Sequence, residues 1–112
     1  MIPLDRERIP SHATHPGELV KDELEARKIT QNDFSKKTKI SPTITNEIIK
    51  GKRRVSIDMA IKLEKFFGIS AETWLNLQKR YDKITAYHKY EAELKKIKLS
   101  PKKRQSILAA VA

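Results

Sequence analysis

The chain has 112 residues and no cysteine, which excludes two ordinary domains, a disulfide framework and thiolate chemistry. Its 24 lysines and arginines against 14 acidic residues give a net charge of +10 at pH 7, which is typical of a protein with a polyanionic partner such as nucleic acid or an anionic membrane surface. No apolar run reaches the ~18 residues of a membrane span and no signal-peptide pattern is present, so we expect a cytoplasmic protein that does not enter a membrane.

The positive charge is concentrated in two segments. Residues 31–56 contain seven basic and two acidic residues, and residues 83–104 contain eight basic and two acidic residues. The remainder of the chain is close to neutral. This distribution differs from that of a generally solvated basic surface and indicates two regions with a specific use for cations.

The first predicted helix follows an N-terminal arm. Residues 1–14 show no apolar periodicity and are predicted to be extended. His15 is predicted to cap a helix that starts at Pro16, carries Glu18 in its first turn and ends near Arg27.

The next stretch predicts two short helices joined by a tight turn. Thr30 is a favourable N-cap, and Asp33 stands at the third helical position. Ser41 is the second N-cap, followed by Pro42 at the first helical position, and Gly51 can adopt the left-handed conformation after the helix end. Because only two residues separate the two helical runs, the helices must cross sharply, as in a helix-turn-helix unit.

Two more helices complete the expected domain. Ser56 starts one, which Gly68 closes, and Ser70 starts the other, in which Trp74 is expected to be a core residue. No strand pattern competes with this all-α, five-helix interpretation of residues 15–82. The expected core contains Leu19, Val20, Leu24, Phe34, Ile40, Ile48, Ala60, Leu63, Phe67, Ile69, Trp74, Leu75 and Leu77.

Residues 83–112 form a basic C-terminal extension that is predicted to be helical. A narrow apolar stripe runs along it, which must pack on the domain or on a second copy. Stacking of single-stranded bases on its tyrosines is the less favoured alternative. Ser100 and Pro101 are predicted to start a short terminal helix. The stripe consists of Ile84, Tyr87, Tyr90, Leu94 and Ile97.

The second short helix is predicted to enter the major groove of DNA, because side chains on its first turns can reach base edges while flanking cations hold phosphates. Its base-contact candidates are Thr43, Asn46 and Glu47, with Ile44 against a thymine methyl group or packed inward. Its phosphate-contact candidates are Gln31, Ser41, Lys50, Lys52, Arg53 and Arg54.

Each of these assignments has a plainer alternative. The base-contact candidates are also ordinary polar surface residues, and the run KGKRR is also compatible with a solvated helix terminus. Ser35 is interpreted as a packing residue whose hydroxyl bonds back within its own helix. His12 and His15 have a metal-like spacing, but nothing completes a ligand set. No catalytic motif appears, so neither an enzyme nor a cofactor is expected.

At this point a family resemblance becomes visible. The segments HPGELVKDEL, QNDFSKKTKIS, IIKGKRRVSIDMAIKLEKFFGIS and AETWLNLQKRYD closely resemble HigA/VapI-type antitoxins, a branch of the Xre/Cro (lambda-repressor-like) helix-turn-helix family. The resemblance covers residues 15–82. It implies a homodimer that represses its own operon and neutralises a co-encoded HigB-like toxin, an mRNA-cleaving ribonuclease.

Carried over by position, the resemblance implies base contacts from Thr43, Ile44 and Glu47, and phosphate contacts from Gln31, Lys50 and Arg53. Three residues depart from the family pattern. Lys39 replaces the usual turn glycine, which predicts a non-glycine residue at positive φ at a cost of ~1 kcal/mol. Ser35 replaces alanine and Thr45 replaces an aliphatic residue. The sequence alone therefore leaves the rotation of the second short helix about its axis undetermined by part of a turn.

Three functions therefore compete. The first is a dimeric antitoxin that binds double-stranded operator DNA and its toxin. The second is a stand-alone or phage-type repressor of the same fold without a toxin. The third is an RNA-binding or protein-interaction module that works through the charged C-terminal segment.

Overall fold

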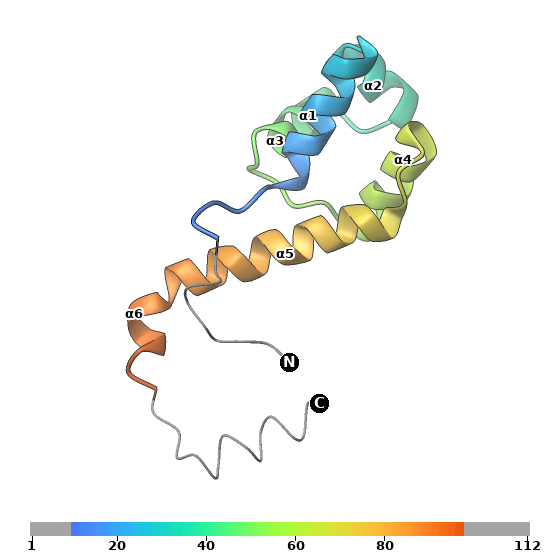
Figure 1. Cartoon of the computed structure of the whole chain (residues 1–112). Coiled ribbons are helices and arrows are strands. Elements are labelled where there is room, and N and C mark those ends of the chain that lie inside the picture. Colours follow the sequence, from blue (N-terminus) through green and yellow to red (C-terminus); the bar gives the residue numbers. More distant parts are fainter. Residues whose placement is uncertain (1–9, 98–112) are drawn as a thin grey trace.

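The computed structural model describes residues 10–97, except for the side chain of Leu94. The expected arm before residue 10 and the expected helix after Ser100 therefore lie outside the described residues. Within them the chain is helical without strands: α1 (Pro16–Arg27), α2 (Gln31–Thr38), α3 (Pro42–Ile49), α4 (Ile57–Phe67), α5 (Ala71–Lys89) and α6 (Glu91–Leu94) (Figure 1). This confirms the all-α, five-helix fold with a helical C-terminal addition.

Local capping determines where the first five helices begin. The side chains of Thr30, Ser41, Ser56 and Ser70 each accept a hydrogen bond from the backbone N–H three residues later. His15 caps α1 in a reciprocal arrangement with Glu18. The sequence predicted all five caps, because a short polar side chain satisfies amides that the helix itself leaves unpaired.

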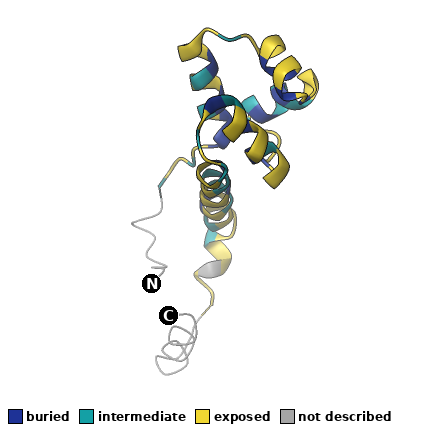
Figure 2. Ribbon diagram, turned by 90° about the vertical axis from the view of Figure 1, so that its right-hand side faces the viewer, coloured by how far each residue is buried: buried dark blue, intermediate teal, exposed yellow. Residues whose placement is uncertain are grey.

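The core lies where α1–α5 meet. Phe34 of α2, Phe67 of α4 and Trp74 of α5 stack in succession, with ring centroids 5.8 and 5.9 Å apart. The Trp74 side chain is fully buried, and its indole N–H donates to the Ile69 carbonyl oxygen at 3.1 Å. Trp74 is therefore a core residue, as expected. The buried residues gather in this bundle, whereas the far part of α5 and α6 are mostly exposed (Figure 2).

Helix α5 links the bundle to the C-terminal extension. It runs without a break from Ala71 to Lys89, so the expected domain boundary between residues 82 and 83 lies inside one helix. Its second half extends beyond the other four helices (Figure 1). Ile84, the first residue of the apolar stripe, is buried, whereas Tyr90 and Ile97 are 41% and 63% exposed. Of the four stripe residues whose side chains the structure describes, Tyr90 and Ile97 therefore find no cover on the bundle, and Tyr87 is partly buried.

Candidate nucleic-acid interface

The rotation of α3 follows from its two buried side chains. Thr45 and Ile48, three residues apart, are 1% and 2% exposed and face the bundle. The opposite side of α3 therefore carries Thr43, which is exposed, and Asn46 and Glu47, which are partly exposed. These three predicted base-contact residues share one outward face, because positions i, i+3 and i+4 of a helix are neighbours.

Ile44, the fourth predicted base-contact residue, lies at the edge of this face. Its side chain is partly buried and packs against the core cluster. The expected inward packing is therefore partly met, and the contact with a thymine methyl group stays a prediction for the part of the side chain that remains open to solvent. An α-helix with its side chains is about 10–12 Å in diameter and fits the B-DNA major groove, which is about 12 Å wide.

Two of the three departures from the family pattern compensate each other. Ser35 and Thr45 are both buried, and their hydroxyl oxygens lie 2.8 Å apart in a hydrogen bond between α2 and α3. The expectation that the Ser35 hydroxyl bonds back within α2 was therefore wrong. A polar residue is tolerated at the aliphatic position because its hydroxyl meets a second one across the helix crossing.

The Ser35–Thr45 hydrogen bond is expected to contribute to stability in a way that a pair of substitutions can test. Thr45→Val leaves the Ser35 hydroxyl buried without its partner, which is expected to cost ~1–3 kcal/mol of folding free energy. Ser35→Ala/Thr45→Val removes both polar groups and is expected to recover most of that loss. Urea unfolding of the single and double variants measures this coupling, and additive losses would contradict it.

The turn between α2 and α3 departs from the family pattern at Lys39. This residue has φ of 60°, in the left-handed region, as the sequence predicted for the position of the usual glycine. The Thr38 hydroxyl donates to the Phe34 carbonyl oxygen at 2.8 Å and accepts from the Ile40 N–H at 3.3 Å. These bonds and the buried Ile40 side chain hold the turn despite the strain.

Helix α1 supports α3 from behind through a close backbone approach. An alanine Cβ at Gly17 would lie 1.8 Å from the Ile48 carbonyl oxygen, so only glycine fits there. The Gly17 N–H donates to Nδ1 of His15 at 2.9 Å. The His15 ring also faces Tyr81 of α5 edge-on at 4.8 Å and lies beside Gly51, where an added Cβ would be 3.6 Å from the His15 Cγ. His15 therefore joins α1, α5 and the segment that leaves α3.

The environment of His15 favours its neutral form. Burial lowers the pKa of His15 below its ordinary value, and this effect outweighs the opposing influence of Glu18, Asp82 and the Arg53 backbone. Protonation would also place a hydrogen on Nδ1, where the Gly17 N–H already points. The unfolded chain, with a histidine pKa of about 6.5, therefore binds more protons than the folded chain between the two pKa values.

It follows that stability should depend on pH in a definite direction. The contribution of His15 is fully present above pH ~6.5 and decreases as the pH falls from there to the lowered pKa of the folded state. His15→Asn keeps a side-chain acceptor for the Gly17 N–H but does not titrate. Thermal unfolding between pH 5 and 8 should show the unmodified protein losing stability relative to His15→Asn on acidification. Parallel curves would contradict this role.

The segment that leaves α3 carries most of the predicted phosphate contacts. We call Lys50, Lys52, Arg53 and Arg54 the basic exit; all four residues are exposed. Gly51 in its middle has φ of 73° and turns the chain away from the helix axis. Gln31 and Ser41, the other two candidates, are exposed at the starts of α2 and α3, where helix N-termini favour anions.

Two of these cations are paired with carboxylates in the free protein. The Arg53 Nε donates to Oε1 of Glu47 at 2.9 Å, and Nη2 of Arg54 lies 2.9 Å from Oδ2 of Asp82. All four side chains are more than one-third exposed, and such surface pairs contribute only ~0–1 kcal/mol. DNA phosphates can therefore compete for both guanidinium groups. The structure thus places Glu47, a predicted base contact, beside Arg53, a predicted phosphate contact.

Sequence reasoning missed two residues of α5 that hold the basic exit. Gln78 is buried, and its Oε1 accepts the Val55 N–H at 2.7 Å. Its amide nitrogen donates to Oδ1 of Asp82 at 2.9 Å. Gln78 lies four residues after Trp74 and therefore on the same face of the helix. A polar residue on this expected core face could have predicted a buried hydrogen-bond partner.

The histidines with a metal-like spacing have other roles. Nε2 of His12 lies 3.5 Å from Oε2 of Glu18, and His15 caps α1. Among residues 10–97, no group of three His, Asp or Glu side chains could hold a metal ion. Nor does any helix in the same range combine the length and the apolar character that crossing a membrane requires.

With the fold and this geometry established, comparisons with known proteins are informative. The helix-turn-helix family model matches residues 20–74. Virulence-associated protein I of Dichelobacter nodosus is 35% identical over 82 residues, which are 72% of this chain and 74% of that protein.

Two solved structures of antitoxins are similar over most of the chain. An addiction module antidote protein of a HigA family from Coxiella burnetii is 35% identical with a TM-score of 0.72. Pseudomonas aeruginosa antitoxin HigA, solved with the higBA promoter, is 34% identical with a TM-score of 0.73. Each match covers 80% of this chain and 98% of the other. The chain therefore belongs to the HigA/VapI-type antitoxins of the Xre helix-turn-helix family.

Proposed function

We propose that this protein binds a double-stranded operator by inserting α3 into the major groove. The observation that carries the proposal is the single outward face of Thr43, Asn46 and Glu47, next to the exposed basic exit. Base edges in the major groove differ in their donors and acceptors, and these three side chains supply both. The Pseudomonas aeruginosa HigA structure, which contains promoter DNA, supports the proposal.

We further propose that the protein represses its own operon and neutralises a HigB-like ribonuclease toxin encoded beside it. This finer assignment draws on the HigA family membership and on the antidote protein from Coxiella burnetii. Co-expression with the product of the adjacent gene tests it. We expect the two proteins to copurify and the chain to relieve growth inhibition by its neighbour. A locus without such a neighbour would favour the stand-alone repressor.

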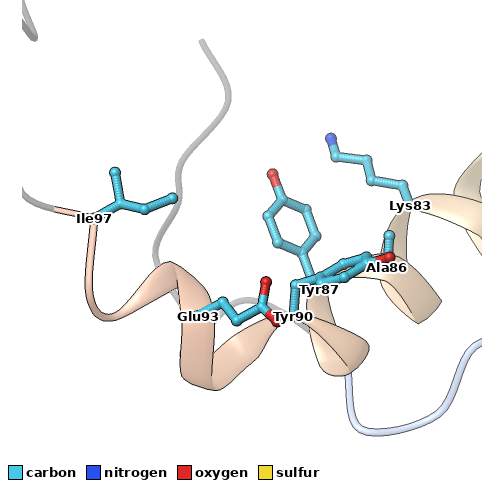
Figure 3. A pocket seen from close by; sticks show the side chains of 6 residues that line it. All are labelled: Lys83, Ala86, Tyr87, Tyr90, Glu93 and Ile97. Carbon is cyan, nitrogen blue, oxygen red and sulfur yellow. The ribbon is translucent and has the colours of Figure 1, made fainter.

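The repressor is proposed to act as a homodimer, because a palindromic operator presents two half-sites roughly 34 Å apart. The surface offered for the second copy is an apolar groove on α5 and the segment after it, lined by Lys83, Ala86, Tyr87, Tyr90, Glu93 and Ile97. Figure 3 shows the ring of Tyr87 and the side chain of Ile97 on either side of the hollow.

Sedimentation equilibrium of the full chain tests this surface. Tyr90→Asp/Ile97→Asp should convert the protein to a monomer that keeps its helical circular dichroism spectrum, because both side chains are exposed in the monomer. A variant that remains dimeric would show that the second copy binds elsewhere.

The salt dependence of binding tests the DNA proposal itself. If four cations per subunit contact phosphates, a dimer neutralises about eight, and the logarithm of the affinity should fall with the logarithm of the salt concentration at a slope near −7. The fragment upstream of the gene and a random duplex of equal length are the two probes. A flat salt response, or equal affinity for the two duplexes, would contradict operator binding.

A further inference from the structure

The carboxylate of Asp82 on α5 contacts the segment that leaves α3 through one oxygen and Gln78 of α5 through the other. Oδ2 lies 2.9 Å from Nη2 of Arg54, and Oδ1 accepts from the amide nitrogen of Gln78 at 2.9 Å. Gln78 in turn accepts the Val55 N–H through Oε1 at 2.7 Å. Asp82 thus contacts the Arg54 guanidinium directly and is linked to the backbone N–H of Val55 through Gln78.

The orientation of this network is fixed by its chemistry. Gln78 is 3% exposed. Its oxygen must face the Val55 N–H, which can only donate, and its nitrogen must face the ionised carboxylate, which can only accept. A flipped amide would leave the buried Val55 N–H and the partly buried Asp82 oxygen without these bonds. The position of Asp82 relative to Val55 is therefore set from the buried side, independently of where the exposed Arg54 side chain points.

Arg54 gains a defined direction from this arrangement. Its side chain is 67% exposed, and a free arginine of that exposure samples many rotamers. A guanidinium has five N–H donors in a planar fork, so it can bond to a carboxylate on one edge and retain donors for a phosphate on another. A side chain ordered before binding loses less entropy when it binds.

We propose that Asp82 is a positioning residue for DNA binding, which orients Arg54 and anchors the end of the basic exit so that Arg54 meets a phosphate. The inference rests on the proposed function, because it assumes that the basic exit contacts DNA. It assigns an acidic residue a favourable role in binding a polyanion.

Asp82→Asn distinguishes a positioning role from a net-charge effect, because the two predict opposite changes in DNA affinity. The substitution raises the net charge by one, so electrostatics alone predicts tighter DNA binding. A positioning role of Asp82 predicts the opposite result, which is weaker binding to the upstream fragment by about two- to tenfold per subunit. The slope of log affinity against log salt should also become less steep, because the Arg54–phosphate contact is lost in part. Asn retains an oxygen that can accept from Gln78.

The matched control removes an acidic residue of another surface. Asp22 is exposed on α1, and Asp22→Asn makes the same change in net charge. We expect it to leave binding unchanged or slightly tighter. Asp82→Asn should also have no further effect when Arg54 is already replaced by glutamine. Thermal unfolding of each variant separates a lost contact from a lost fold.

A second variant keeps the test decisive if Asp82→Asn does not fold. Arg54→Lys preserves the charge but not the fork, so it should weaken binding to the upstream fragment if Arg54 bridges Asp82 and a phosphate. Unchanged binding by Arg54→Lys would overturn the inference. So would equal or tighter binding by Asp82→Asn, or an equal loss in the Arg54→Gln background. Failure of the unmodified protein to bind any duplex would instead overturn the proposed function, and this inference with it.

Discussion

Replacing Gly17 with alanine is expected to lower the midpoint of thermal unfolding by roughly 10 °C or more and to abolish operator binding. The new Cβ would lie 1.8 Å from the Ile48 carbonyl oxygen and 2.7 Å from the carbonyl carbon. These are backbone atoms near the end of α3, so no side-chain rotation can relieve the overlap, and overpacking of this kind costs ~1–3 kcal/mol or more. Differential scanning calorimetry measures the loss.

The effect on DNA binding follows from what the same carbonyl does. The Ile48 carbonyl oxygen accepts the Gly51 N–H at 3.0 Å, so moving it disturbs the turn into the basic exit. Gly68→Ala is the control for steric overlap: Gly68, unlike the helical Gly17, has a positive φ of 77°, but an added Cβ there would meet no atom within 4 Å. We expect that control to lose only ~1–2 kcal/mol and to keep its DNA affinity. Equal losses in both variants would contradict the proposed close packing of α1 on α3.

Replacing Arg53 and Arg54 together with glutamine is expected to weaken binding to the upstream fragment and to random DNA alike, by roughly a hundredfold near physiological salt. A dimer would lose four phosphate contacts, so the slope of log affinity against log salt should become less steep by about four. Because phosphate contacts carry no sequence information, the ratio between the two duplexes should change little. Fluorescence anisotropy at several salt concentrations measures both quantities.

Lys62→Gln/Lys65→Gln provides the charge-matched control. Both lysines are exposed on α4, and their loss lowers the net charge equally without touching the basic exit. A similar drop in affinity for both double variants would mean that net charge, and not position, determines binding. Thr43→Ala should behave differently from both, since a base contact alters the preference among sequences.

The starts of the first five helices could be predicted from the sequence because N-capping is a local event, whereas the continuation of α5 to Lys89 was not predicted. His15, Thr30, Ser41, Ser56 and Ser70 each satisfy amides within three residues of themselves. The outward face of α3 could also be anticipated, since it follows from helical periodicity once the buried positions are known.

The contacts between distant segments could not be predicted in the same way. The Ser35–Thr45 hydrogen bond spans ten residues, and the pairing of Val55 with Gln78 spans 23. Both depend on how the helices cross, and a residue pattern does not specify that crossing. The sequence therefore identified Ser35 and Thr45 as two separate departures from the family, whereas the structure shows one compensated pair.

The ion pairs of the basic exit could not be predicted from the sequence either. Counting cations located the basic exit, but counting could not show that Arg53 and Arg54 each pair with a carboxylate in the free protein. The pairing of Arg54 involves Asp82, which lies outside both of the basic segments counted in the sequence. The contribution of each of these two arginines to DNA binding therefore depends on a carboxylate partner that only the three-dimensional structure reveals.

Mapping of backbone amide chemical shifts by NMR during titration with the upstream duplex tests the central claim most directly. If α3 enters the major groove, the largest changes should fall at Gln31, along residues 41–47 and in the basic exit, while the far half of α5 shifts little. Changes confined to residues 83–97, with α3 unaffected, would contradict the account and favour a module that works through the C-terminal segment.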